Sequence, residues 1–235
     1  MENALYMNDS YLKEFDAKVA SVKDDKFIVL DKTAFYPSGG GQPNDAGIMI
    51  CNGEEYPVVY VGKFDGKISH EVSKPGLKTG DKVNCRVDWE RRYRLMRMHT
   101  AAHIIGAILY KEAGALYTGN QLGLDKSRID FSLDVLDREK IQQYLGMANE
   151  CVQKSVDVRI YYLPREEALK IEGIVKLASI MPPEVKELRI VEIPGIDLQA
   201  DGGTQVKNTS EIGQISLVAI ENKGKNNRRM YYTVD

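Results

Sequence analysis

The sequence MHTAAH, residues 98–103, places His99 and His103 four residues apart in a chain that contains only three histidines. On a helix, side chains four residues apart lie on the same face, so the two imidazoles could bind one metal ion. In HExxH zinc enzymes a glutamate after the first histidine serves as the general base, whereas Thr100 occupies that position here. The pair therefore indicates either half of a metal site or two buried, hydrogen-bonded histidines, and the apolar neighbours suit burial.

Further ligands for such a site would have to come from elsewhere in the chain. The most informative stretch is GIDLQADGGTQVKNTSEIG, residues 195–213, which is polar and glycine-rich and lies between two predicted strands. Turns of this kind expose backbone N–H groups and side chains to a ligand. Within it, Asp201 could bind a metal, whereas Gln205 is a better hydrogen-bonding group than zinc ligand. We expect His70 to be a surface residue of a strand and Cys151 to be a buried apolar residue of a helix.

The first part of the chain has the pattern of β structure. Short apolar segments bounded by Gly, Asn, Asp or Pro follow one another at close spacing, in residues 15–22, 26–33, 47–52, 54–64, 66–72 and 81–89. Several short strands joined by turns are typical of a small β-barrel. We therefore expect an N-terminal barrel over residues 1–89, ending near Trp89.

The second part mixes helical and strand patterns. Apolar residues recur at helical spacing after the barrel, at Leu95, Met98, Ala102, Ile105 and Leu109. This helix should end near Gly114, and a second amphipathic helix should follow an N-cap at Asp137. Strands are expected at residues 127–134, 157–164, 187–193, 214–224 and 228–234, with a short helix at 165–171. Helices mixed with antiparallel strands predict an α+β second domain over residues 90–235.

The composition of the 235-residue chain is that of a soluble globular protein, with 43% hydrophobic and 28% charged residues. Its net charge of −2 gives no overall positive field, so any RNA binding must come from local basic patches. Three widely separated cysteines without a CxxC pair favour free thiols in a reducing cytoplasm. The N-terminus lacks the apolar segment of a secretory signal, and no apolar run approaches the roughly 20 residues that span a bilayer. We expect a cytoplasmic protein without membrane or DNA partners.

A second glycine-rich stretch, FYPSGGGQPNDAG, covers residues 35–47. Gly39, Gly40 and Gly41 permit positive φ and a close approach of the backbone to a ligand. No Lys-Ser or Lys-Thr follows the glycines, so a phosphate-binding P-loop is disfavoured. The stretch is either a hairpin connection or a loop beside a binding site, in which Gln42 is a candidate contact.

Three of these motifs, RMHTAAHIIGAIL, ADGGTQVKNTSEIG and FYPSGGGQPNDAG, resemble the editing domain of alanyl-tRNA synthetase and the free-standing alanyl-tRNA editing proteins of the AlaX family. They occur in the family's order and span most of the chain, and the closing stretch NKGKNNRRMYY is similar to the same proteins. The chain has no room for an aminoacylation domain, so it resembles a free-standing editor of intermediate size. The resemblance implies an α+β protein, with a small N-terminal β-barrel followed by a two-layer editing domain of antiparallel sheet and helices.

The family pattern is HxxxH on a helix, followed later in the chain by CGGTH before a strand. By position, the resemblance implies that His99 and His103 are ligands of Zn²⁺. Asp201 stands where many members have the cysteine, and it is a candidate third ligand because carboxylates bind zinc. Gln205 stands in place of the last histidine, and we expect it to line the site or to be a weak ligand. Three protein ligands with an open fourth position would suit a catalytic site better than a structural one.

The resemblance also implies a reaction, hydrolysis of the aminoacyl ester of alanine tRNA wrongly charged with serine or glycine. An alanine pocket cannot strongly reject the smaller glycine, or serine with its one extra hydroxyl, so a second site must sort the products. We expect Asp201, Gln205 and Thr100 at the catalytic site, with the attacking water ordered by the metal or by Asp201. Thr100, Thr118 and Thr204 are candidates for contacting the serine hydroxyl, although each also suits ordinary helix or turn structure.

Basic residues near the predicted site could hold the phosphates of the acceptor end of the tRNA. Tyr93 and Tyr231 lie among them and could stack on bases. A solvated charged surface is the plain alternative. The expected tRNA contacts are Gly39, Gly40, Gly41, Gln42, Arg91, Arg92, Arg94, Arg97, Lys223, Lys225, Arg228 and Arg229.

Two other functions remain open from the sequence. The chain could be a non-catalytic tRNA-binding module with a degenerate metal site, because it lacks both the cysteine and the last histidine of the family pattern. It could also be an unrelated zinc hydrolase that acts on a small ester. A salt-sensitive affinity for tRNA would argue against this last function.

Overall fold

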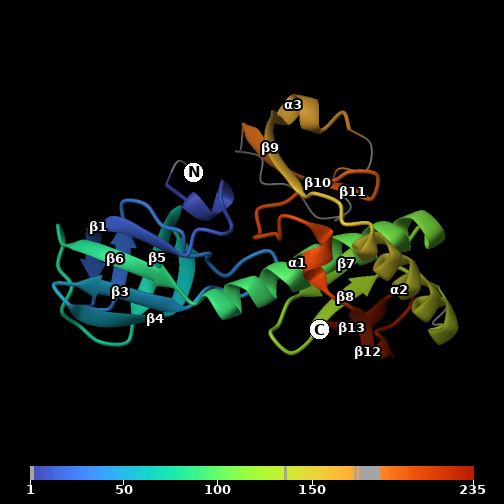
Figure 1. Ribbon diagram of the computed structural model, residues 1–235, viewed down its shortest axis with the longest axis horizontal. Helices are drawn as coiled ribbons and strands as arrows, with labels where there is room; N and C mark the ends of the chain where they lie inside the picture. The colour runs from blue at the N-terminus through green and yellow to red at the C-terminus, as the bar shows by residue number, and fades with distance from the viewer. Residues whose placement is uncertain (1–2, 135–136, 172–173, 175–185) are drawn as a thin grey trace. The chain divides into compact units, whose positions relative to one another are not determined.

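The structure is a computed structural model that describes residues 3–134, 137–171, 174 and 186–235 (Figure 1). It divides into two compact units, Met1–Arg94 and Leu95–Asp235. Helix α1 (Trp89–Ala113) continues through this division, so the domain boundary expected between residues 89 and 90 stays a prediction. Among the described residues, no helix is both long enough and apolar enough to span a membrane.

The first unit is a closed barrel, which confirms the small N-terminal barrel expected from the sequence. Its strands pair antiparallel in the order β1-β2-β5-β4-β3-β6. Closure pairs every strand on both sides, so the barrel has no open edge for another chain to join. The elements are a short 3₁₀ helix η1 (Leu5–Met7) and the strands β1 (Glu14–Lys23), β2 (Phe27–Leu30), β3 (Gly47–Cys51), β4 (Glu54–Phe64), β5 (Lys67–Val72) and β6 (Lys82–Val87).

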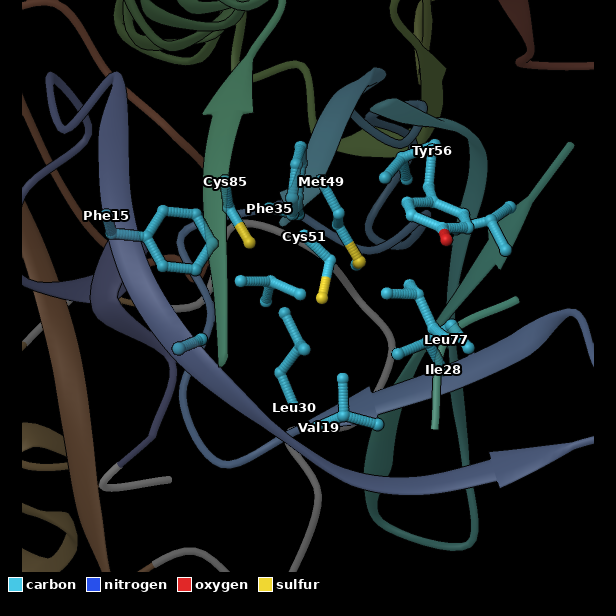
Figure 2. Packing of buried hydrophobic residues seen from close by; sticks show 14 of the residues in the cluster. Phe15, Val19, Ile28, Leu30, Phe35, Met49, Cys51, Tyr56, Leu77 and Cys85 are labelled. Carbon is cyan, nitrogen blue, oxygen red and sulfur yellow. The ribbon is translucent and has the colours of Figure 1, made fainter. Parts of the chain in front are cut away.

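The barrel interior is filled by the inward-facing side chains of its strands. Along β1, Phe15, Ala17 and Val19 are buried while the residues between them are exposed. This alternation follows from the two-residue period of strand side chains. Figure 2 shows apolar side chains from other strands, including Ile28 and Cys85, meeting in the same interior. The barrel therefore has a hydrophobic core of its own. Each large apolar side chain in it contributes about 1.5–3 kcal/mol to stability through burial.

His70 on β5 is fully buried in the barrel, so our expectation of a surface position is wrong. Its Nδ1 lies 2.8 Å from the carbonyl oxygen of Ile28, and its Nε2 lies 2.9 Å from the hydroxyl of Thr33. Because a carbonyl oxygen only accepts, Nδ1 carries the proton and Nε2 accepts from Thr33. Burial lowers the pKa of His70 to about 4, against the opposing effect of the Ile28 carbonyl. The signal was present in the sequence, because Ile68, His70 and Val72 alternate along the strand and share one face.

The second unit combines two antiparallel sheets with helices, which confirms the α+β class. One sheet has four strands in the order β12-β13-β8-β7, and the other has three in the order β11-β10-β9. Besides the end of α1, the elements are β7 (Tyr117–Gln121), β8 (Ser127–Phe131), α2 (Arg138–Gln153), β9 (Arg159–Pro164), α3 (Arg165–Ala168), β10 (Glu187–Ile193), β11 (Asp197–Ala200), η2 (Thr209–Ile212), β12 (Ile215–Asn222) and β13 (Arg228–Val234).

Local signals explain several of these elements. The side chain of Asp137 accepts hydrogen bonds from the backbone N–H groups of Glu139 and Lys140, which confirms the predicted N-cap of α2. Cys151 on this helix is buried, also as predicted. The sequence does not predict β7 or β11, because their sequences YTGNQ and DLQA are too polar to show the apolar alternation of a strand.

Candidate functional site

Helix α1 carries His99 and His103 on one face, as their spacing predicts. Both side chains are almost fully buried, and their ring centroids are 5.3 Å apart. An apolar helix face surrounds them, because Leu95, Met98 and Ala102 are buried as well. The pair is therefore presented from a rigid, packed element rather than from a loop.

The four-stranded sheet holds α1 at the two turns that carry the histidines. Tyr232 donates a hydrogen bond of 2.7 Å to the carbonyl oxygen of Met98, and Tyr117 donates to the carbonyl oxygen of Ala102. Each of these carbonyls belongs to the residue immediately before a histidine. Gly106 makes room for the ring of Tyr117, because a Cβ at this position would lie only 2.0 Å from it.

Asp201 reaches the two histidines from the loop after β11. Its backbone N–H donates to the carbonyl oxygen of Arg189 at 3.1 Å, and its Oδ2 accepts from the N–H of Gly203 at 2.6 Å. Its Oδ1 lies 3.4 Å from Nε2 of His99. The candidate ligand atoms of His99, His103 and Asp201 all lie within 4.8 Å of one another. The fold thus brings together the three residues that the motifs single out.

The charge and chemistry of this cluster fit a zinc ion. Burial raises the pKa of Asp201, but its interactions with His99, and then with His103 and Arg189, together outweigh burial and hold the pKa below its usual range. Asp201 is therefore ionised, which is the form in which a carboxylate binds a cation. Two imidazoles and one carboxylate are the ligand set of several catalytic zinc sites, which keep a further position for water or substrate.

The other ring nitrogen of His103 faces Asp197, a residue that the sequence analysis missed. Nδ1 of His103 lies 2.8 Å from Oδ2 of Asp197, whose side chain is fully buried at the start of β11. Gln199 donates to the same oxygen at 2.9 Å. A signal existed, because residues 197, 199 and 201 alternate in an extended segment and so face one side.

Gln205 lines the cluster and is oriented by Thr100. The hydroxyl of Thr100 lies 2.7 Å from Oε1 of Gln205 and 3.1 Å from the carbonyl oxygen of Met96. The amide nitrogen of Gln205 lies 3.3 Å from Nε2 of His103 and 3.3 Å from Oδ2 of Asp201. With its oxygen towards Thr100, the amide presents a donor to the site, which suits a lining residue better than a ligand. Ligation by Gln205 stays a prediction.

The remaining threonine candidates lie in different settings. Thr204 is fully buried in the loop between Asp201 and Gln205. Thr118 on β7 is exposed, and its hydroxyl donates to the side chain of Asn227 at 3.1 Å. A contact from either residue to a serine hydroxyl stays a prediction.

The glycine-rich loop of the barrel forms a tight turn closed by two backbone hydrogen bonds between Gly39 and Gln42, of 3.1 and 2.9 Å. Gly40 and Gly41 take positive φ angles of 59° and 82°, which glycine adopts without strain. The loop therefore contains the tight turn that a hairpin connection requires. Gly39 and Gly40 are exposed, whereas Gln42 is buried, so direct contact of the Gln42 side chain with tRNA is disfavoured.

Arg92 was expected to contact tRNA, but its burial contradicts this. The side chain is fully inside the first unit, where Nε donates to Oδ1 of Asp45 at 2.9 Å. The remaining guanidinium nitrogens donate to the carbonyl oxygens of Ser10 and Ala34 and to the same carboxylate. A guanidinium paired in this way ties the start of α1 to the barrel loops and is not available to a phosphate.

The C-terminal basic set also has partners within the protein. Arg228 is buried and donates to oxygens of four residues, so the expected tRNA contact is contradicted there too. Arg229 pairs with Asp130 at 2.6 Å, and Lys223 pairs at 2.8 Å with the glutamate two residues before it. Lys225 is exposed, and no partner is found for it among the described residues.

The other arginines of α1 are half-buried rather than fully exposed. Nε of Arg91 donates to the carbonyl oxygen of Asn44 at 3.0 Å, and Arg97 donates twice to that of Ile212, at 3.1 and 2.7 Å. Arg94 lies between them on the helix. Contacts of these three residues with tRNA stay predictions.

Comparison with known proteins adds the decisive observation. Residues 4–91 match the family described as tRNA synthetases class II (A), and residues 188–231 match the threonyl and alanyl tRNA synthetase second additional domain. The chain is 52% identical over 241 residues to the alanyl-tRNA editing protein AlaX-M of Methanosarcina barkeri, across 100% of this chain and 99% of that protein. The chain belongs to the AlaX-M family of alanyl-tRNA editing proteins.

Other relatives agree with membership of the AlaX-M family. The AlaX-M protein of Methanosarcina acetivorans is 51% identical over 243 residues, across 100% of this chain and 99% of that protein. The alanine–tRNA ligase of Pyrococcus furiosus is 40% identical over 222 residues, which cover 92% of this chain but 24% of the ligase. The family resemblance inferred from the motifs is thereby confirmed.

Proposed function

We propose that this protein is a trans-editing hydrolase that cleaves the aminoacyl ester of alanine tRNA wrongly charged with serine, and of the same tRNA charged with glycine. The strongest support is the convergence of His99, His103 and Asp201 in a chain that matches alanyl-tRNA editing proteins along its whole length. The similarity to part of an alanine–tRNA ligase supports the same class of substrate.

The three converging residues would hold a Zn²⁺ ion through two imidazole nitrogens and one carboxylate oxygen. When bound, zinc lowers the pKa of a coordinated water or polarises an ester carbonyl. Oδ1 of Asp201 is the carboxylate oxygen on the side of His99, whereas Oδ2 accepts hydrogen bonds from Gly203 and Gln205. As a hydrogen-bond acceptor, the carboxylate can also orient a water molecule. An aminoacyl ester is more reactive than an amide, so modest activation of water is sufficient.

Gln205 supplies the donor that the site offers to a substrate. Its amide NH₂ faces the cluster, and an ester carbonyl or a serine hydroxyl can accept a hydrogen bond from it. Thr100 acts through Gln205 by bonding the amide oxygen, so it has a positioning role. A site that hydrogen-bonds the serine hydroxyl favours serine over both glycine and alanine, because neither of these can pair with that buried polar group.

The test is a deacylation assay on alanine tRNA charged with serine, glycine or alanine, with and without a chelator. We expect rapid hydrolysis of the serine ester, slower hydrolysis of the glycine ester, and little hydrolysis of the alanine ester. The chelator should abolish activity, and Zn²⁺ should restore it. His103→Ala should lower the rate more than about 100-fold, since even loss of an outer-shell partner of a metal ligand typically costs 10–100-fold.

The matched control is Cys151→Ala, which removes a potential zinc-binding thiol outside the cluster. This variant should keep both its metal content and its activity. Full activity in a folded His103→Ala protein would contradict the metal centre.

The family pattern itself favours one alternative function. Asp201 and Gln205 replace the cysteine and histidine of CGGTH, which is the change expected of a tRNA-binding module that has lost catalysis. Such a module would bind alanine tRNA without hydrolysing any of the three esters and would contain no metal after purification without chelators. The same assay and metal analysis therefore separate the two functions.

A further inference from the structure

The Asp197 side chain is a fully buried carboxylate that lies outside the proposed ligand set but contacts one of its members. Oδ2 lies 2.8 Å from Nδ1 of His103, and the side chain of Asp197 is completely shielded from solvent. Burial of a carboxylate is costly unless the group is paired and hydrogen-bonded. An apolar residue would fill the same space without this cost, so packing alone does not explain an aspartate here.

The hydrogen-bond pattern around this carboxylate fixes where the proton of His103 lies. Gln199 donates its amide N–H to Oδ2 of Asp197 at 2.9 Å, which makes this oxygen an acceptor for two donors. A carboxylate has no proton to give, so Nδ1 of His103 must be the nitrogen that carries hydrogen. The lone pair of the ring is then on Nε2, the nitrogen on the side of Gln205.

From this geometry we propose that Asp197 is a positioning residue, which holds His103 in the Nδ1–H tautomer and so presents Nε2 to the metal. The inference rests on the proposed metal centre. A carboxylate that accepts a hydrogen bond from one ring nitrogen of a ligating histidine sets the tautomer and orientation of the ring and raises the basicity of the other nitrogen. Gln199 supports the arrangement in turn, because it holds the carboxylate from the same strand.

The tautomer can be measured directly on the metal-free, full-length protein. The chain has only three histidines, so long-range ¹H–¹⁵N spectra of the imidazoles should be simple to assign. We expect His103 to be in the Nδ1–H tautomer in the wild type, and to shift towards Nε2–H in Asp197→Ala. His70 is an internal reference, because its Nδ1–H donates to the carbonyl of Ile28 and should be unchanged in every variant.

The affinity for Zn²⁺, measured by competition with a chromophoric chelator, provides the second readout. Asp197→Asn keeps an oxygen acceptor but removes the charge, so it should weaken Zn²⁺ binding by about tenfold, and Asp197→Ala by about 100-fold. The matched control is Asp130→Asn, which removes another partly buried, ion-paired carboxylate of the same unit and should leave the affinity unchanged. If Asp197→Ala does not fold, the isosteric Asn variant still gives both readouts.

The two readouts separate failure of this inference from failure of the proposed function. If the wild type binds no Zn²⁺, the metal centre is wrong, and the tautomer shift alone decides whether Asp197 orients His103. If the wild type binds Zn²⁺ while both Asp197 variants keep the wild-type tautomer and affinity, the positioning role is overturned. A graded loss from Asp to Asn to Ala, with His70 unaffected, is the expected result.

Discussion

Among single residues, His70 shows how burial of a titratable side chain makes the stability of the fold depend on pH. Its imidazole is neutral in the barrel interior, where both nitrogens have partners that suit the uncharged ring. Burial lowers its pKa from 6.5 to about 4, although the Ile28 carbonyl acts in the opposite direction. The unfolded chain therefore binds a proton at a pH at which the folded protein does not.

This shift predicts that acid weakens the fold through His70. The stabilisation is fully present above the pKa of the unfolded state, near 6.5, and it is lost as the pH falls towards 4. Between pH 7 and pH 5 the wild type should lose about 2 kcal/mol more in its free energy of unfolding than His70→Gln, which does not titrate. Urea unfolding at the two pH values measures this difference. Equal losses in the two proteins would refute the assignment.

How far single residues can be predicted depends on whether their role is local. The spacing of His99 and His103 suffices to place both on one helix face. The pairing of Arg92 with Asp45 joins residues 47 positions apart, and nothing near either residue reveals it. For that reason the sequence predicts an exposed tRNA contact at Arg92, whereas its side chain is fully buried and paired with Asp45.

At the scale of elements, helix α1 contains Gly106 at an interior position, although glycine has a low helix propensity. Glycine inside a helix costs about 1 kcal/mol relative to alanine. In α1, however, a Cβ at position 106 would lie 2.0 Å from the ring of Tyr117, so glycine fits there although alanine would form the helix better. The close packing brings the Tyr117 hydroxyl to the carbonyl of Ala102, next to His103.

Two glycine substitutions therefore should have opposite effects. Gly106→Ala should destabilise the protein by about 1–3 kcal/mol, since overpacking outweighs the gain in helix propensity. Gly146 in α2 is exposed and has no atom within 4 Å of a Cβ, so Gly146→Ala should stabilise the protein by about 0.5–1 kcal/mol. Chemical denaturation of both variants provides the measurement. Stabilisation by Gly106→Ala would show that Tyr117 can move away without cost.

Elements with strong apolar periodicity are predictable, whereas short polar strands are not. The sequences of α1 and of the six barrel strands carry the helical or alternating pattern that burial requires. Strand β11 has no such pattern, and it forms because β10 pairs with it antiparallel, with Ile193 opposite Asp197. This pairing also delivers Asp201 and Asp197 to the histidines. The local sequence marks Asp201 only as a possible metal ligand, and its assignment to the same site as the two histidines came from the family resemblance.

On the scale of the whole molecule, several basic side chains are paired within the protein and so are not available to bind phosphates. The net charge is −2, and several cations that seemed available to tRNA are neutralised within the protein. Arg92 pairs with Asp45, Arg229 pairs with Asp130, and Arg228 is buried among oxygen acceptors. Of the basic residues expected to contact tRNA, exposed Lys225 is then the clearest candidate for a phosphate contact.

Binding through phosphate contacts predicts that the affinity for tRNA falls as the salt concentration rises. Each contact contributes about one unit to the slope of log K against log salt, because neutralising a phosphate releases its counterion. Lys225→Ala should therefore weaken binding several-fold and reduce the slope by about one. Lys154→Ala, which removes an exposed cation at the end of α2, should leave the slope unchanged. Filter binding of alanine tRNA at several salt concentrations measures both variants. If the wild-type affinity did not change with salt, neither a tRNA-editing role nor a tRNA-binding module would survive, and a small ester would become the better candidate substrate.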